Sequence, residues 1–197
     1  MDDDAALLRA WQAGDRAAGH ALVTRHYDAV ERFFQNKAGA EADDLVQLTF
    51  LRWQAATWRG EGSLRAFLLG VARNVLYEHV RRRVRDGPAD VEQRSIADLR
   101  PGVATQAAQR AKHRLLLRAL QRIPLEGQVL LELFYWEDLS IAELAVTLDV
   151  PEGTVKSRLH RARGWLRDAI ARAPAEDGDP ASVRALLAAW LEAMERR

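Results

Sequence analysis

The sequence predicts an all-α protein of two small helical domains joined by a flexible linker, with one further helix at the C-terminal end. Nearly every periodic stretch repeats its apolar residues at helical spacing, and the alternation that marks β-strands is absent. Between Asp86 and Thr105 the pattern stops, and glycines and prolines stand where large apolar residues are scarce. A hydrophobic fraction of 48% with 29% charged residues is typical of a globular chain.

The breaks in periodicity divide the 197 residues into four parts. These are a first domain at 1–85, a linker at 86–106, a second domain at 107–173 and an extension at 174–197. An apolar arc of roughly 140° predicts a helix on which the core side holds Leu22, Val23, Tyr27, Val30, Phe33 and Phe34. Further helices are expected at about 43–57, at 63–83, and from 107 to 172 with a break at Pro124.

Charge is unevenly distributed along a chain whose formal net charge is only +1. Ten acidic residues outnumber seven basic ones from Met1 to Gly62, whereas residues 63–85 hold six arginines and one acid. Residues 151–172 hold six bases against two acids. Two separate basic segments indicate two local contacts with a polyanion, and solvated helix faces are the alternative.

Composition also disfavours several classes of protein. The chain has no cysteine, which excludes disulfides and thiolate metal sites and agrees with a reducing cytosol. No apolar run approaches the roughly 20 residues that span a bilayer. The acidic start, Met1–Asp4, differs from the positively charged start of a secretory signal. We therefore expect a cytoplasmic protein without membrane contact, cofactor or metal.

Residues 140–163 have the pattern of a helix-turn-helix. Ser140 and Glu143 form an S-x-x-E capping box that starts its first helix, and the turn follows at Asp149. Pro151 suits the first position of the next helix, where its missing N–H costs nothing. The buried side of the first helix is expected to hold Ile141, Leu144, Ala145 and Leu148.

The second helix of this motif separates apolar and basic residues. Its apolar residues fall within an arc of about 80° and are Val155, Leu159, Ala162, Leu166 and Ala169. The opposite side, whose donors can reach phosphates and guanine edges in a major groove, holds Lys156, Ser157, His160, Arg161, Gly164 and Arg167. A plain amphipathic helix with a wet basic side is the alternative. His160 has no second histidine or carboxylate cluster beside it, so no metal site is expected there.

The helix expected at 43–57 has two different sides. Its core side is predicted to hold Leu45, Val46, Thr49, Phe50 and Trp53. On the other side, Leu48 and Leu51 lie beside Asp44 and Gln47, and leucines on an exposed polar face suggest a protein-binding surface. Packing of these two leucines on a neighbouring helix is the alternative.

The helix expected at 63–83 also carries two stripes. One is expected to be buried and contains Leu64, Phe67, Leu68, Val71 and Val75. The other contains Gly70, Asn74, Tyr77 and Arg81, and the helix ends on three arginines, which suit its dipole. An exposed aromatic ring with amide and arginine neighbours can stack on an unpaired base.

Two segments together are similar to a known family. Residues 43–50 (DDLVQLTF) and 58–83 (WRGEGSLRAFLLGVARNVLYEHVRRR) resemble the second region of extracytoplasmic function sigma factors. Residues 120–167 resemble their fourth region, and the order and the linker also match. The resemblance extends from about Leu7 to Arg172.

The resemblance implies an alternative sigma factor that binds promoter DNA and core RNA polymerase, the latter through the β′ coiled coil and the β flap. The residues implied for the β′ contact are Asp44, Gln47, Leu48 and Leu51, with Leu48 where the family usually has Glu. The residues implied for reading and melting the −10 element are Trp58, Arg59, Asn74, Tyr77, Glu78 and Arg81. Those implied for the −35 element are Lys156, Ser157, Arg158, His160 and Arg161. Whether an anti-sigma factor also binds stays open.

Two other classes of function are alternatives to a sigma factor. A conventional helix-turn-helix regulator with a sensing first domain would bind palindromic DNA as a dimer, without polymerase. The acidic-polar helix at Asp43 and the arginine-tipped third helix disfavour it. An enzyme is not expected, because the sequence shows no nucleophile with a nearby base, no metal cluster and no phosphate-binding glycine loop.

The C-terminal extension is predicted to stabilise or regulate the protein and not to read promoters. A helix over about 181–195 would gather one apolar face from Val183, Leu186, Leu187, Trp190, Leu191 and Met194. A helix of about 15 residues is marginal alone, so this face is expected to pack on its own chain or on another protein.

Overall fold

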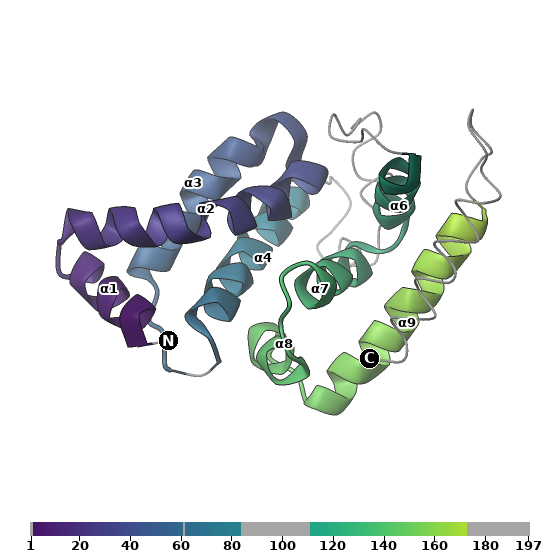
Figure 1. The fold of residues 1–197 in the computed structure, drawn as a ribbon. Helices are drawn as coiled ribbons and strands as arrows, with labels where there is room; N and C mark the ends of the chain where they lie inside the picture. The colour runs from purple at the N-terminus through teal and green to yellow at the C-terminus, as the bar shows by residue number, and fades with distance from the viewer. Residues whose placement is uncertain (1, 61, 84–110, 173–197) are drawn as a thin grey trace.

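The computed structural model describes residues 2–60, 62–83 and 111–172. Within these ranges the chain forms eight α-helices and one short 3-10 turn, and no strand, which confirms the all-α prediction. Figure 1 shows the helices in two groups, α1 to α4 and α6 to α9. The predicted linker and the predicted C-terminal helix lie outside the described residues.

The first group begins with a helix that the sequence analysis did not predict. Its elements are α1 (Asp2–Gln12), α2 (Arg16–Ala38), the 3-10 turn η1 (Gly39–Glu41), α3 (Ala42–Ala55) and α4 (Leu64–Arg83). The Asp15 side chain caps α2 by accepting hydrogen bonds from the backbone N–H groups of Ala17 (2.8 Å) and Ala18 (3.2 Å). Gly19 lets α1 approach α2, because a Cβ there would lie 2.3 Å from the Trp11 ring nitrogen.

The core of the first group is centred on Trp53, which is fully buried. Its ring meets those of Trp11, His26 and Phe50 edge to face, at centroid distances of 6.1, 5.7 and 6.1 Å. All five residues predicted for the core side of α3 are buried. On α4, Leu64, Leu68 and Val75 are buried as predicted, whereas Phe67 and Val71 are half-buried against the core.

The second group contains α6 (Ala111–Arg122), α7 (Leu125–Tyr135), α8 (Ile141–Leu148) and α9 (Glu152–Ala171). The predicted break at Pro124 separates α6 from α7. Helix α9 packs against all three others. Gly127 permits the close crossing of α7 and α9, because a Cβ there would lie 2.9 Å from the Trp165 ring.

The two groups pack against each other, which the sequence analysis did not predict. Helix α8 contacts α4, α6 contacts α2, and the buried apolar side chains of both groups belong to one continuous cluster. In Figure 1 the α8 helix lies beside the beginning of α4. Among the described helices, none combines the length and the apolarity that a bilayer crossing requires.

Candidate nucleic-acid interface

The predicted helix-turn-helix is formed by α8, a short turn and α9. The capping box is confirmed: the Ser140 hydroxyl accepts a hydrogen bond from the Glu143 N–H (3.2 Å), and the Glu143 carboxylate accepts one from the Ser140 N–H (3.0 Å). Asp149 ends α8 in the left-handed region (φ 52°, ψ 52°). Pro151 lies at the N-cap of α9, one residue before the first helical position predicted for it, because its ψ of 149° is extended.

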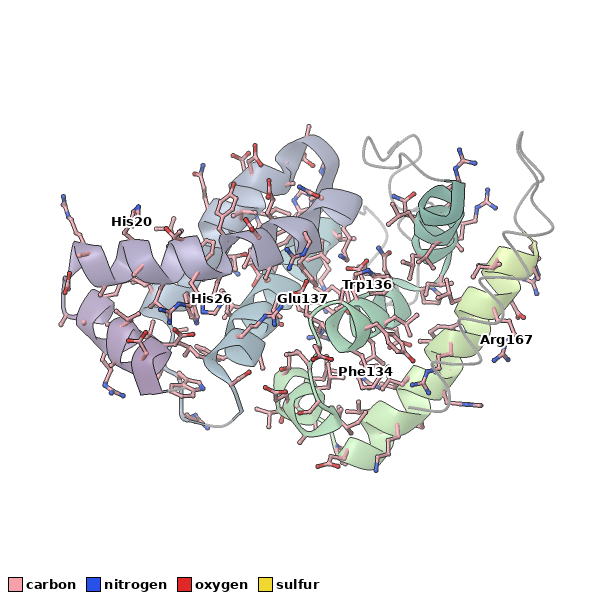
Figure 2. All side chains as sticks on the ribbon, viewed as in Figure 1. His20, His26, Phe134, Trp136, Glu137 and Arg167 are labelled. Atoms are coloured by element: carbon pink, nitrogen blue, oxygen red, sulfur yellow. The ribbon has the colours of Figure 1, made fainter. Side chains whose placement is uncertain are left out.

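Helix α9 presents its basic side outward. Val155, Leu159, Ala162 and Leu166 are buried as predicted, and Ala169 is half-buried. On the opposite side the exposed residues are Lys156, Ser157, His160, Arg161 and Arg167. Figure 2 shows Arg167 projecting from the outer side of α9. A helix that follows a short turn and carries hydrogen-bond donors along one exposed side has the geometry of a helix that enters a major groove.

The arginines of α9 differ in their surroundings. The Arg161 guanidinium lies 5.8 Å from the centre of the Trp165 ring and is exposed. Arg158 is half-buried and, with Arg161, lines a small cavity shared with Arg73 and Tyr77 of α4. Arg158 is therefore less available to DNA in this arrangement than the other four residues predicted for the −35 element.

Helix α3 displays the predicted polar and apolar side away from the core. Asp44 and Gln47 are exposed, and Leu51 is 63% exposed. Leu48 is half-buried and packs against the core. The alternative prediction, that these leucines pack within the protein, therefore holds in part for Leu48 and not for Leu51. Leu51, an exposed leucine among polar side chains, is a candidate anchor for another protein.

Tyr77 on α4 departs from the sequence-based expectation. It was expected to be an exposed aromatic residue, but only 3% of it is exposed. The Arg73 guanidinium lies 4.3 Å from the centre of its ring, and a cavity beside it is lined by Leu130, Leu148 and Trp165 of the second group. The expectation was wrong because it treated α4 as the outer surface of an isolated domain.

The other residues predicted for the −10 element lie in differing environments. Trp58 is half-buried against the core, Arg59 and Arg81 are exposed, and Asn74 is exposed beside α8. Glu78 accepts two hydrogen bonds from Arg52, of 2.8 and 2.7 Å. The Arg52 guanidinium lowers the pKa of Glu78, and the carboxylate is held away from any role as a free acceptor.

Several charged residues between the two groups were not recognised in the sequence. Glu137 is 4% exposed at its side chain and pairs with Arg32 of α2 (3.5 Å) and with Arg65 of α4. Lys37 of α2 is fully buried and pairs with Glu132 of α7. One sequence feature could have revealed this pair, namely Glu132, a charged residue inside the apolar run of α7. A buried charge requires a partner of opposite charge.

Comparison with known proteins agrees with this architecture. Residues 22–86 match the profile described as "Sigma-70 region 2", and residues 113–166 match "Sigma-70, region 4". The "ECF RNA polymerase sigma factor SigM" of Mycobacterium tuberculosis is 34% identical over 167 residues, which cover 83% of this chain and 82% of the relative. The chain belongs to the ECF sigma factor family. It is an alternative sigma factor, and its function lies in transcription initiation.

More distant relatives and solved structures agree with this assignment. The "ECF RNA polymerase sigma-E factor" of Salmonella typhimurium is 26% identical to this sigma factor over 172 residues, 81% of this chain and 90% of the relative. The structure of CnrH in complex with the cytosolic domain of CnrY has a TM-score of 0.61 at 20% identity, covering 87% of this chain and 99% of that one. The sigma factor RpoE from Bartonella quintana, in complex with the anti-sigma factor NepR, has a TM-score of 0.59 at 23% identity, covering 79% and 98%. These two structures support the fold.

Proposed function

We propose that this sigma factor binds core RNA polymerase through the outer side of α3 and reads two promoter elements with α4 and α9. The main support is the exposed side of α9, on which Lys156, Ser157, His160 and Arg161 lie together. The opposite side of the helix is buried in the core of the second group. Each good pair between a side chain and a base edge contributes roughly 1–3 kcal/mol of discrimination. Reading of the −35 element is assigned to the exposed side.

The −10 element is assigned to α4 and the loop before it. Trp58 and Arg59 precede the helix, and Asn74, Tyr77 and Arg81 lie along it. Aromatic and arginine side chains suit an unpaired strand, whose bases stack and whose phosphates need neutralising. Tyr77, which is buried, would have to be uncovered for this task. Glu78 would first have to leave Arg52.

The polymerase contact is assigned to Asp44, Gln47, Leu48 and Leu51 on α3. Leu51 is the most exposed large hydrophobic residue among those described, at 63%. None of the described residues covers it fully, and a partner surface of the β′ coiled coil would bury it. The β flap is proposed as the partner of the second domain.

Binding by an anti-sigma factor is a further part of the proposal. Two of the solved structures similar to this chain are complexes, one of CnrH with the cytosolic domain of CnrY and one of RpoE with the anti-sigma factor NepR. A protein of that class would compete with polymerase if it covered the outer side of α3. Co-purification with and without excess core polymerase tests for such competition.

The test of the polymerase contact uses Leu51→Glu, with Thr24→Glu as its matched control. Both positions are exposed on helices of the first group, and both variants introduce the same charge. We expect Leu51→Glu to lose capture by immobilised core polymerase and run-off transcription, while Thr24→Glu keeps both. Equal capture of the two variants would remove α3 from the proposed interface.

A conventional regulator remains distinguishable from a sigma factor by its behaviour without polymerase. We expect the free protein to bind duplex promoter weakly and the complex with core polymerase to bind it tightly. Gel shifts with and without core polymerase measure this difference. Tight and specific binding by the free protein would favour the regulator.

A further inference from the structure

We infer that Trp165 is a positioning residue for Arg161, and that its indole ring holds the Arg161 guanidinium on the side of α9 assigned to the −35 element. The inference rests on the proposed function, because it concerns one of the residues to which that function assigns the −35 contact. Neither the helical pattern nor the family resemblance selected Trp165. This residue acts on promoter recognition through Arg161, without touching DNA itself.

The first observation is the contact between the two side chains. The central carbon of the Arg161 guanidinium, Cζ, lies 5.8 Å from the centre of the Trp165 ring. This is within the roughly 6 Å over which a cation is attracted to the face of an aromatic ring. Residues four apart on a helix are neighbours, and a helical side chain leans toward the N-terminal end of its helix. The ring of Trp165 is therefore directed back toward Arg161 by the helix itself.

The second observation is that the Trp165 ring is fixed from its other side. The side chain is half-buried and packs against the core. A Cβ added at Gly127 of α7 would lie 2.9 and 3.0 Å from Cε3 and Cζ3 of the ring. The ring thus lies directly on the backbone of α7, at a position where any side chain would displace it. Because glycine is less favourable than alanine inside a helix, this close contact gives Gly127 a structural reason.

The third observation concerns the other groups around Arg161. Its side chain is exposed, and among the described residues no carboxylate forms an ion pair with it. Arg73 and Arg158 border the same small cavity and repel a third positive charge. An exposed arginine loses rotamer freedom when it binds, at a cost in entropy. Stacking on a fixed ring reduces that cost and orients the planar fork that a bidentate contact to guanine requires.

A second arginine on α9 shows a different arrangement. The Arg163 Nε–H donates a hydrogen bond to the Tyr135 hydroxyl (2.8 Å), and Arg163 is half-buried. Its guanidinium lies 5.9 Å from the centre of the Phe134 ring, which faces it from α7 (Figure 2). Arg163 is thereby tied to the core of its own domain. Arg161 has a ring contact but, among the described residues, no hydrogen bond, so its N–H donors stay available for DNA.

The inference is tested by base preference at the −35 element, which a general loss of stability would not alter. Run-off transcription with core polymerase is measured on promoters in which each −35 base pair is substituted in turn. Arg161→Ala first identifies the base pair whose discrimination depends on Arg161. Discrimination is then the ratio of transcription from the best promoter to transcription from promoters changed at that base pair. Failure of the unmodified protein to distinguish any −35 base pair would count against the proposed function instead.

We expect Trp165→Leu to lower this discrimination by roughly two- to fivefold, as loss of a cation–π contact at an exposed site would. Trp165→Phe keeps an aromatic ring and should retain most of the discrimination. Phe134→Leu is the matched control, because it removes the ring beside Arg163 and should leave the discrimination unchanged. Unchanged discrimination by Trp165→Leu, or equal losses by its leucine and phenylalanine variants, would overturn the inference.

A double-mutant cycle separates action through Arg161 from an independent effect. Binding of the best promoter by polymerase that carries each variant is measured by gel shift. If Trp165 acts through Arg161, Trp165→Leu should weaken binding in the unmodified protein and cause no further loss in the Arg161→Ala protein. Losses that add in full would show that Trp165 contributes independently of Arg161, against the inference.

A second variant moves the ring without removing it. Gly127→Ala places a methyl group where the Trp165 ring lies, so the ring has to shift away from α7. We expect discrimination to fall about twofold, the lower end of a cation–π contact, with no further fall when Trp165→Leu is also present and leaves room for the methyl group. Urea unfolding followed by circular dichroism identifies the folded variants, and Gly127→Ala provides the test if Trp165→Leu does not fold. Unchanged discrimination in folded Gly127→Ala protein would contradict the positioning role.

Discussion

The outer side of α9 and the stripe on α4 are both assigned to DNA, yet the structure presents them differently. Helix α9 contacts α6, α7 and α8, so its own domain completes its buried side and leaves Lys156 and His160 exposed. On α4, by contrast, Tyr77 is buried and Glu78 is paired with Arg52. The exposed surface of α9 is complete once its own domain has folded. The exposure of the stripe on α4 depends instead on how the two domains are arranged.

The largest expected effect comes from breaking the buried pair that joins the domains. Lys37→Met leaves the Glu132 carboxylate buried without its cation, which typically costs about 3–5 kcal/mol. Urea unfolding followed by circular dichroism should show this loss. The double variant Lys37→Met with Glu132→Leu removes both charges and should recover most of the stability, because an apolar pair of similar volume is often neutral.

The single and double variants also show whether charge or packing holds the domains together at this pair. If the single and double variants lose equal stability, then packing rather than charge holds the domains together at this point. In that case the contact between α4 and α8 would contribute more to holding the domains together than this ion pair.

Arg161→Ala is expected to have the next largest effect, on the −35 element. The side chain is exposed on the free side of α9, and loss of a good contact to a base costs about 1–3 kcal/mol, a roughly tenfold or greater loss of recognition. Arg172→Ala is the control, because Arg172 lies past the end of α9 and forms an exposed ion pair with Asp168 at 3.7 Å. Run-off transcription on promoters with altered −35 elements measures both.

Equal transcription by the Arg161 and Arg172 variants would show that the reading side of α9 is wrongly assigned. Arg161 also borders the cavity shared with α4, beside Arg73 and Arg158. Its loss removes one of three positive charges there and should not weaken the packing of α8 on α4.

Trp58→Ala is expected to impair melting of the −10 element by about tenfold. Stacking of an aromatic ring on an extruded base contributes roughly 1–3 kcal/mol and is made only after the strands part. Permanganate footprinting should therefore show a strong defect on duplex promoter and a weak one on a pre-melted template. Equal defects on both templates would indicate that Trp58 acts through its packing against the core.

Much of this structure was predictable because the relevant signals are local. The capping box at Ser140, the apolar side of α3 and the end of α4 at Arg83 depend on residues a few positions apart. The exposed donors of α9 followed from the same periodicity. Helix α1 was not predicted, although acidic residues in its first turn and Leu7, Leu8 and Trp11 at helical spacing are local signals of the same kind.

The misjudged residues owe their environment to distant parts of the chain. Tyr77 is covered by side chains more than 50 positions away, and Lys37 finds its partner Glu132 95 positions further on. Helical periodicity cannot report such contacts, because it describes one helix at a time. Glu132 inside an apolar run was the one sign that a buried charge needed a partner from elsewhere.

The smallest effect on stability is expected at Glu78, on the α4 surface assigned to the −10 element. Hydrogen bonds from Arg52 lower the pKa of Glu78, so this pair stabilises the fold above the pKa of the unfolded chain, about 4.3. That contribution is lost as the pH falls through the lower pKa of the folded protein. Because both side chains are more than a third exposed, solvent screening limits the effect to below about 1 kcal/mol. Glu78→Gln should therefore lower stability slightly at pH 7 and flatten its dependence on pH below about 4.3, as thermal melting would show. If Glu78→Gln also frees Arg52 to hold DNA phosphate, melting of the −10 element should improve while −35 recognition by α9 stays unchanged.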